Sequence, residues 1–172
     1  MILAGLLAAV LAAAAAQGQE TPPDPPPPAS LAAKDVSAWV EAHLDAQDWR
    51  VLAINPHGVL LASPGGVKLR ADGFAEADLR HEMFAPIELG NGQMRSDLEH
   101  WLVNCQDRRH ALMRMSLYTH NNLKDEFASR GTEEPKWLET ANDDEAAQAV
   151  EAMCQAVEGK TPPAAHKPPE HP

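Results

Sequence analysis

Cys105 and Cys154 are the two residues whose chemistry the sequence predicts most directly, since the chain has no other cysteine. Two cysteines cannot supply four ligands to a structural zinc ion unless histidines converge on them. In an oxidising compartment, two thiols most simply form a disulfide. We therefore predict a Cys105–Cys154 disulfide, which would contribute roughly 4 kcal/mol to stability in the chain-entropy description.

The eight histidines provide a second test for site chemistry. His81, His100 and His110 fall on predicted strands, but no two of them lie at ligand spacing within one element. Alternation along the strand also directs His100 to the face opposite Cys105. His166 and His171 lie in the C-terminal tail, where histidines bind metal only weakly. The histidines therefore predict no metal site, and no motif in the chain predicts a cofactor.

The carboxylates and arginines around residue 100 give only a weak indication of catalysis. Asp97 and Glu99 share a strand face by the period of two, and general acid–base catalysis uses two positioned carboxyl groups. Such a pair is common by chance in a chain with 25 Asp and Glu residues. Arg108 and Arg109 could bind a carboxylate but are more typical of an exposed turn. The sequence also lacks phosphate-binding, nucleophile-elbow and zinc-protease motifs, so we expect no enzyme and no catalytic residue.

A β-hairpin and a C-terminal helix must position the two cysteines. The hairpin is predicted from strands at 98–105 and 110–118, and its alternation places Trp101 and Val103 on the face of Cys105. In the final helix, Val150 and Met153 share a stripe with Cys154. The stripe also contains Ala146 and Val157. We expect Trp101, Val103, Val150 and Met153 to form the core around the disulfide.

The remaining pattern predicts an α+β domain. A short amphipathic helix is expected at 35–47, capped by Asp35, and strands at 49–54, 59–62 and 67–71 read as a meander. A longer strand covers 78–89, with Pro86 indicating an edge or an interruption. The segment 123–137 has too weak a pattern to assign. The last helix should begin near Thr140 or Asn142 and end at Gly159.

The N-terminus and the composition predict the location of the protein. Residues 1–16 carry no charge and resemble a signal peptide, although no Lys or Arg precedes the apolar run; a start further upstream or an anchored helix would be alternatives. We expect a proline-rich linker at 17–33, the α+β domain at 34–159 and a disordered proline-rich tail at 160–172. No later run is long enough to span a membrane. The net charge of −11 disfavours nucleic acid and anionic lipid as partners.

Residues 49–154 resemble the bacterial surface-adhesin protein E family. The resemblance rests on Trp49 in the first strand, Val103-Asn-Cys105 before an arginine-containing turn, Tyr118 ending a strand, and Trp137 ahead of the helix that contains Cys154. It implies a six-stranded antiparallel sheet with the C-terminal helix fastened to one face by the disulfide. It also implies adhesion to host matrix and plasma proteins, and homodimer formation. The chain departs from the family in having no lipid-acceptor cysteine and no glycine after Tyr118.

These observations lead to three functional hypotheses. The first is a periplasmic or secreted, non-enzymatic protein that recognises an extracytoplasmic protein ligand, as an adhesin does. The alternative is a periplasmic inhibitor or accessory subunit of an envelope enzyme, because such proteins are often small, disulfide-closed β domains. The third is an enzyme that uses the histidines or carboxylates. The sequence identifies neither the binding surface nor the partner.

Overall fold

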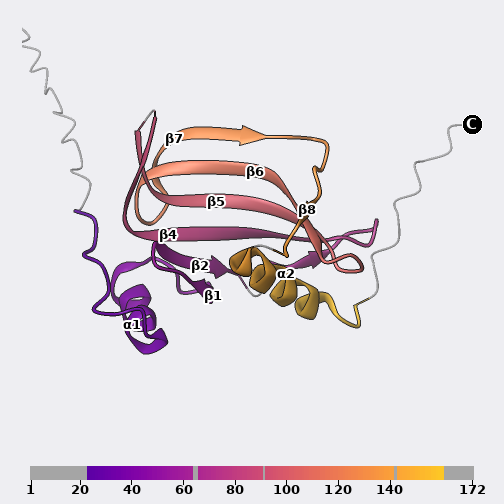
Figure 1. Ribbon diagram of the computed structural model, residues 1–172, viewed down its shortest axis with the longest axis horizontal. Helices are drawn as coiled ribbons and strands as arrows, with labels where there is room; N and C mark the ends of the chain where they lie inside the picture. Colours follow the sequence, from indigo (N-terminus) through magenta and orange to yellow (C-terminus); the bar gives the residue numbers. More distant parts are fainter. Residues whose placement is uncertain (1–22, 64–65, 91, 142, 161–172) are drawn as a thin grey trace, which may run out of the picture.

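The computed structural model describes residues 23–63, 66–90, 92–141 and 143–160. The predicted signal peptide at 1–16, the tail from 161, and the first part of the proline-rich linker lie outside these residues. The described chain forms one antiparallel sheet with two helices packed on it (Figure 1). This is the α+β class that the sequence predicts. No helix within the described ranges is long and apolar enough to cross a membrane.

The elements occur in the following order. They are α1 (Ala33–His43), β1 (Arg50–Ile54), β2 (Gly58–Ala62), β3 (Lys68–Leu69), β4 (Ala75–Leu89), β5 (Gly92–Asn104), β6 (Arg109–His120), β7 (Lys124–Gly131), β8 (Leu138–Glu139) and α2 (Asp144–Val157).

Six strands form the continuous sheet, in the order β1-β2-β4-β5-β6-β7, and two short strands flank it. The predicted six-stranded antiparallel sheet is therefore confirmed. The predicted meander is wrong at its third strand, because β2 pairs with β4 and not with β3. At fifteen residues, β4 is long enough to pair with β2 along 79–83 and with β3 at 75–76. Strands β2 and β3 therefore lie one after the other along the same edge of β4.

The C-terminal helix α2 begins at Asp144, two residues after Asn142, one of its two predicted starts. The side chain of Asp143 caps it by accepting a hydrogen bond from the Ala146 backbone nitrogen at 3.0 Å, and acidic residues in the first turn face the positive end of the helix dipole. Its apolar stripe is buried, as predicted, and α2 lies against β1 and β4 with its margin on β5 and β6. The buried stripe consists of Ala146, Ala149, Val150, Met153, Cys154 and Val157.

The N-terminal helix α1 packs on the opposite face of the sheet. Its buried side chains, Val36, Trp39 and Val40, meet Val59 and Phe84 in a second core cluster. Asp35 does not cap this helix as predicted. The N-cap position is Ala32, which offers no side-chain acceptor, and Asp35 lies within the first turn, where it bonds the Ser30 hydroxyl.

The described part of the proline-rich segment lies against the domain. The indole nitrogen of Trp39 donates to the Pro26 carbonyl at 2.6 Å. Asp24 bonds the imidazole of His120 at 3.1 Å and lies 3.4 Å from the Arg95 guanidinium. Residues 24–26 are thus attached to both α1 and the end of β6.

The two helices leave half of the sheet uncovered. Both pack mainly against β1, β2 and β4, on opposite faces, and α2 contacts β5 and β6 only along its margin. Figure 1 shows α2 across the lower strands, with β5, β6 and β7 extending beyond it. The fold therefore exposes one face of three long strands beside the start of α2.

Candidate functional site

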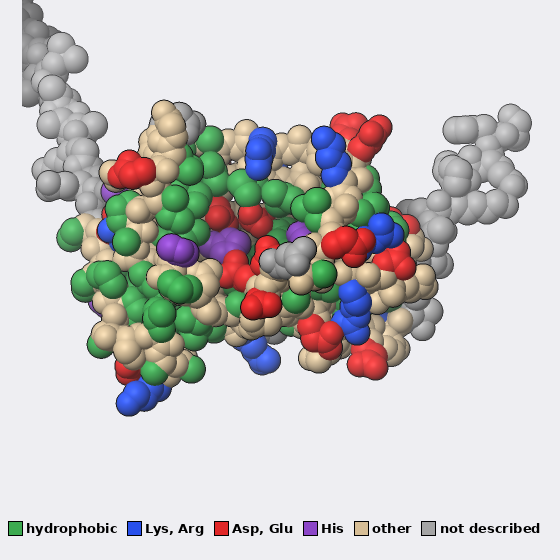
Figure 2. Space-filling model, in the orientation of Figure 1, with side chains coloured by type: hydrophobic (Ala, Val, Ile, Leu, Met, Phe, Trp, Pro, Cys, Tyr) green, Lys and Arg blue, Asp and Glu red, His purple; other side chains and the backbone are tan. Residues whose placement is uncertain are grey.

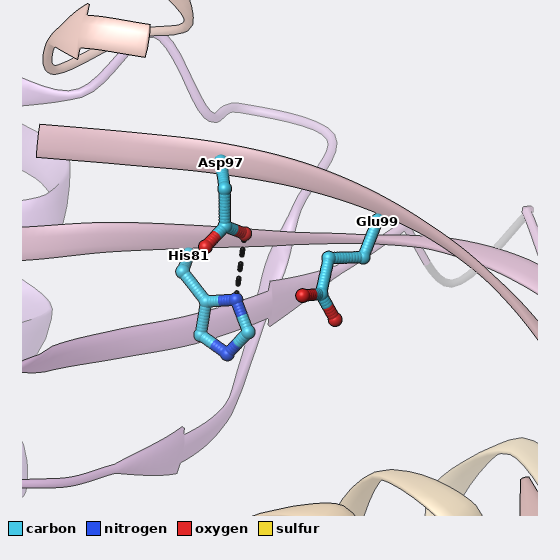
Figure 3. A group of neighbouring side chains, drawn as sticks. All are labelled: His81, Asp97 and Glu99. Atoms are coloured by element: carbon cyan, nitrogen blue, oxygen red, sulfur yellow. Dashed lines mark hydrogen bonds and ion pairs between the residues drawn. The ribbon is translucent and has the colours of Figure 1, made fainter. Parts of the chain in front are cut away.

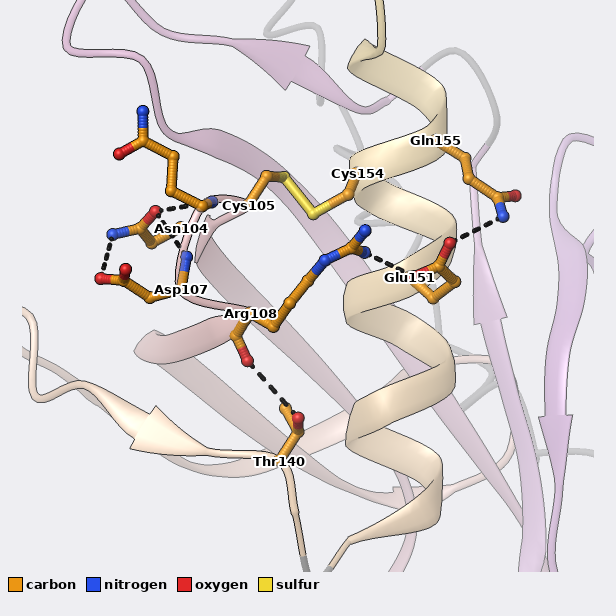
Figure 4. The surroundings of a disulfide bond; sticks show 9 residues. Asn104, Cys105, Asp107, Arg108, Thr140, Glu151, Cys154 and Gln155 are labelled. Atoms are coloured by element: carbon orange, nitrogen blue, oxygen red, sulfur yellow. Dashed lines mark hydrogen bonds and ion pairs between the residues drawn. A yellow bond between two sulfur atoms is a disulfide. The ribbon is translucent and has the colours of Figure 1, made fainter.

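The predicted disulfide is present and connects the sheet to α2 (Figure 4). Cys105 follows β5, Cys154 lies in the third turn of α2, and their Cα atoms are 5.5 Å apart. The turn between β5 and β6 adds two more contacts to this region. The Arg108 guanidinium pairs with Glu151 of α2, and the Arg108 carbonyl accepts from the Thr140 hydroxyl at 3.4 Å. Arg108 is therefore engaged with the chain's own helix.

The residues expected around the disulfide all lie in one apolar core. Trp101, Val103, Val150 and Met153 are buried in the same cluster as Cys154, and Cys105 packs against that cluster. The disulfide, the Arg108–Glu151 pair and this apolar core all join the sheet to α2. The disulfide region therefore contributes to stability.

A cluster of titratable side chains lies on the α2 face of the sheet, beyond this apolar core (Figure 3). His81 of β4 is the direct cross-strand partner of Asp97 of β5, and Glu99 follows two residues later on the same face. The His81 Nδ1 atom lies 2.7 Å from Asp97 Oδ1, and its Nε2 atom lies 2.8 Å from Glu145 Oε1 in the first turn of α2. We call His81, Asp97, Glu99 and Glu145 the acidic–histidine cluster.

Two carboxylates of the acidic–histidine cluster, Glu145 and Glu99, also accept hydrogen bonds from neighbouring side chains. The Asn55 amide, in the turn after β1, donates to Glu145 Oε2. The Trp101 indole nitrogen donates to Glu99 Oε2 at 2.6 Å. The cluster therefore joins β4, β5 and α2 to the turn after β1.

Burial and charge act in opposite directions on His81. Burial alone would lower its pKa, because it disfavours the charged imidazolium. The hydrogen bonds to Asp97 and Glu145 more than offset this effect, and the pKa of His81 rises to about 10. His81 is therefore an imidazolium at neutral pH when the acidic–histidine cluster holds no other cation.

The carboxylates respond to the same environment in different ways. The hydrogen bond from His81 lowers the pKa of Glu145. Burial, followed by the negative charge of Asp97, raises the pKa of Glu99. The single positive charge of the His81 imidazolium is thus shared by three carboxylates, those of Asp97, Glu99 and Glu145.

This geometry also meets the distance requirement for a metal ion. Ligand atoms from His81, Asp97 and Glu99 all lie within 4.8 Å of one another. An imidazole with two carboxylates is a donor set that first-row divalent cations accept. The histidine pattern in the sequence predicts no metal site. The site depends on how β4 is aligned with β5, and the pattern does not contain that alignment.

The three histidines that were tested together in the sequence do not converge. His100 bonds Asp78 at 2.8 Å on the opposite face of β5, as the alternation predicts. His110 stacks on Trp101 with ring centroids 4.1 Å apart, and its Nδ1 atom is buried without a described hydrogen-bond partner. Only His81 of the three belongs to the acidic–histidine cluster.

A groove opens from the acidic–histidine cluster across the uncovered strands. A hollow of about 380 Å³ is lined by Asp97 together with Met115, Leu117, Ala128 and Arg130. Register places these residues in two rows on one face: Asp97, Leu117 and Ala128 in one, and Glu99, Met115 and Arg130 in the other. We call this surface of β5, β6 and β7 the open face.

The groove continues along the sheet beyond the first hollow. A second hollow of about 330 Å³ shares Met115 and Arg130 with the first and extends to the exposed Leu138 of β8. Figure 2 shows hydrophobic side chains over the open face, with carboxylates and histidines in the depression between it and α2. The open face is therefore an apolar, elongated surface with an acidic end.

A second buried polar network, on the α1 face, has a structural role. Arg80 pairs with the fully buried Glu82, whose other oxygen accepts from the Asn121 amide at 2.7 Å. Arg80 also donates to the Asp45 carbonyl at 2.8 Å and to Asn122. These bonds attach the β6–β7 turn and the loop after α1 to the centre of β4.

Solved structures of one protein have a similar fold over part of the chain. The chain is similar to the structure of Haemophilus influenzae protein E, with 12% identity and a TM-score of 0.47 over 63% of this chain and 85% of that one. A second crystal form gives 13% identity, a TM-score of 0.47 and coverage of 63% and 88%. The protein from non-typeable Haemophilus influenzae gives 11%, 0.44, and coverage of 61% and 74%.

Sequence comparison is the more decisive of these findings. None of the curated proteins matches the chain. The sequence profile of the family described as surface-adhesin protein E matches residues 49–155, which run from the start of the sheet through the disulfide to α2. The chain therefore belongs to the surface-adhesin protein E family.

Proposed function

We propose that this protein is an exported, non-enzymatic binding protein that recognises an extracytoplasmic protein partner through the open face. The observation that carries the proposal is the uncovered half of the sheet, since α2 reaches β6 only along its margin and neither helix makes an extensive contact with β7. Family membership supports an adhesin-like role. The disulfide supports an oxidising compartment, either periplasmic or extracellular.

The open face has the composition of a protein-binding surface. Met115, Leu117 and Ala128 are only half-buried in the protein alone, and they lie in adjacent rows on β6 and β7. A binding partner would remove this apolar surface from water, which is a favourable process of about 25 cal/mol per Å². Methionine is suited to such a surface because its flexible side chain adapts to different partners.

Charge indicates what kind of partner fits. The chain has a net charge of −11, and the groove ends at the carboxylate of Asp97. A partner with a positively charged surface would therefore be attracted over distance and oriented on the open face. We propose a protein segment that presents apolar side chains to the groove and Lys or Arg to its acidic end.

The state of His81 supports a non-enzymatic role. With a carboxylate at each ring nitrogen, the imidazolium at neutral pH cannot accept a proton as a general base. The second carboxylate that acid–base catalysis would use, Glu99, is occupied by the Trp101 indole. His81 is thus engaged at both ring nitrogens and Glu99 at one of its two oxygens.

The binding experiment must separate an external partner from an envelope partner. Purified mature protein would be immobilised and exposed to a panel of purified extracellular-matrix and plasma proteins, and in parallel to bacterial envelope extract. We expect saturable binding to at least one matrix or plasma protein that weakens at high salt. Capture of an envelope enzyme with loss of its activity, and no binding to the panel, would instead identify an inhibitor.

A further inference from the structure

We propose that His81, Asp97 and Glu99 form a binding site for one first-row divalent cation, of which Zn²⁺ is the best match. The site shares Asp97 with the acidic end of the open face, but it is tested by metal binding alone, so its failure and the failure of the proposed protein binding are distinguishable. The site lies between β4 and β5 and is reached through the groove that Asp97 lines.

The geometry of the paired strands supports a metal site. The side chains come from two directly paired strands, so the backbone fixes their separation: His81 lies opposite Asp97, and Glu99 is two residues further along the same face. Their ligand atoms lie within 4.8 Å of one another. Nitrogen and oxygen ligands at about 2.0–2.2 Å from Zn²⁺ require only a modest inward movement of flexible carboxylates.

The orientation of the His81 imidazole also supports a metal site. Its Nε2 atom points at Glu145, which accepts the hydrogen bond at 2.8 Å and is itself held by Asn55. A metal-bound histidine commonly donates its second ring nitrogen to a carboxylate in this way, which fixes the ring and its tautomer. With Glu145 in that supporting position, Nδ1 is the nitrogen directed toward Asp97 and available to a cation.

The cluster also holds an excess of buried negative charge. Asp97 and Glu99 are only 4% and 7% exposed. Among the described residues, neither carboxylate forms an ion pair with a lysine or arginine, and each has one oxygen without a hydrogen-bond donor. Buried carboxylates require compensation by positive charge. One imidazolium compensates only part of the cluster, and a divalent cation that replaces its proton would compensate one further negative charge.

The chemistry of the donors selects the class of ion. A nitrogen ligand favours zinc and its neighbours over Ca²⁺ and Mg²⁺, which prefer all-oxygen sites with more ligands. Three protein ligands leave one position of a tetrahedral ion open toward the groove. Binding must release the proton from His81 Nδ1, so affinity should increase as pH rises.

Zinc titration of the untagged full chain, stripped with a chelator, tests the proposal. We expect about one Zn²⁺ per chain by calorimetry and elemental analysis, and a higher thermal midpoint with zinc than without it. Glu99→Gln should weaken binding by roughly tenfold or more while preserving the acceptor for Trp101. Ca²⁺ at the same concentration should leave the thermal midpoint unchanged.

Two controls separate this site from other histidines. His100→Gln removes an imidazole from the opposite face of the same strand, and the double variant His166→Gln and His171→Gln removes the tail histidines. Both should bind zinc as the unmodified chain does. Absence of zinc binding and of a thermal shift would overturn the proposal. So would equal affinity in Glu99→Gln and the unmodified chain, or loss of binding in the tail variant.

Discussion

His81 and Glu82 are neighbours in β4, and each is the centre of a polar network on a different face of the sheet. His81 joins Asp97 and Glu145 beneath α2, whereas Glu82 joins Arg80 and Asn121 beside α1. Their contacts differ in consequence. The Glu82 network is closed by internal donors, but the acidic–histidine cluster keeps an excess of carboxylate oxygens next to a groove.

Glu82→Gln should be strongly destabilising. The substitution leaves the buried Arg80 guanidinium without its counter-ion, and removing one partner of a buried ion pair typically costs about 3–5 kcal/mol. Urea unfolding would measure the loss. Glu76→Gln is the matched control on the same strand, because Glu76 is partly exposed and lies 3.6 Å from Arg70, so its loss should cost under about 1 kcal/mol. Equal effects of the two variants would contradict this account of the network.

His110→Phe should remove part of the acid sensitivity of folding. Burial lowers the pKa of His110, so the unfolded chain takes up a proton more readily than the folded one. The contribution of His110 to stability is therefore complete above about pH 6.5 and is lost as pH falls below that value. Phenylalanine keeps the stack on Trp101 and removes the unpaired nitrogen.

The measurement for His110 is the free energy of unfolding at pH 7 and pH 5 in both proteins. At pH 7 the variant should be within about 1 kcal/mol of the unmodified protein, and it should lose less stability on acidification. Parallel losses in the two proteins would show that His110 does not titrate on unfolding.

At the scale of single residues, the sequence could predict which residues share a face of a strand, but not which residues lie opposite them on the neighbouring strand. The period of two places Asp97 and Glu99 together, and the structure agrees. It cannot show that His81 lies opposite Asp97, because register depends on the length of the connection and on the bulge between Glu82 and Ile87. Glu145 looked like a helix-dipole residue, and its contact with His81 depends on where α2 docks.

At the scale of elements, strong periodicity made α2 and the β5–β6 hairpin predictable, and weak periodicity concealed β7. The α2 stripe is apolar at every buried position, so its docking face was evident. Strand β7 (Lys124–Gly131) is an edge strand with mostly exposed side chains, and its sequence therefore lacks the alternation that burial imposes. The turn before it uses Asn122 and Leu123 with positive φ, an unusual conformation for leucine.

Replacing both cysteines with serine should weaken the attachment of α2 to the sheet. The disulfide spans 49 residues, and closing a loop of that length contributes about 4 kcal/mol in the chain-entropy description. Urea unfolding of the double variant should show a loss of this order, and reduction of the unmodified protein should reproduce it. A loss below about 1 kcal/mol would mean that the apolar stripe alone holds α2.

At the scale of the whole molecule, the two helices stabilise one half of the sheet and leave the other half accessible. The covered half contains both core clusters and the disulfide, whereas the open face has a groove and an acidic end. The sequence predicted β1 to β6 and both helices, but neither β7 nor this asymmetry. Helix periodicity shows that a helix has an apolar face, and does not show which strands that face will cover.

Binding of the protein to its best ligand from the matrix and plasma panel, with and without Ala128→Glu, tests the central claim most directly. Ala128 lines the groove from β7, so a glutamate there would block the open face with bulk and charge. Leu31→Glu is the control, because Leu31 is 47% exposed and lies just before α1. We predict roughly tenfold weaker binding for Ala128→Glu and a change of at most about twofold for Leu31→Glu. Equal binding by Ala128→Glu and the unmodified protein, or no binding of the unmodified protein to any panel member, would contradict the account.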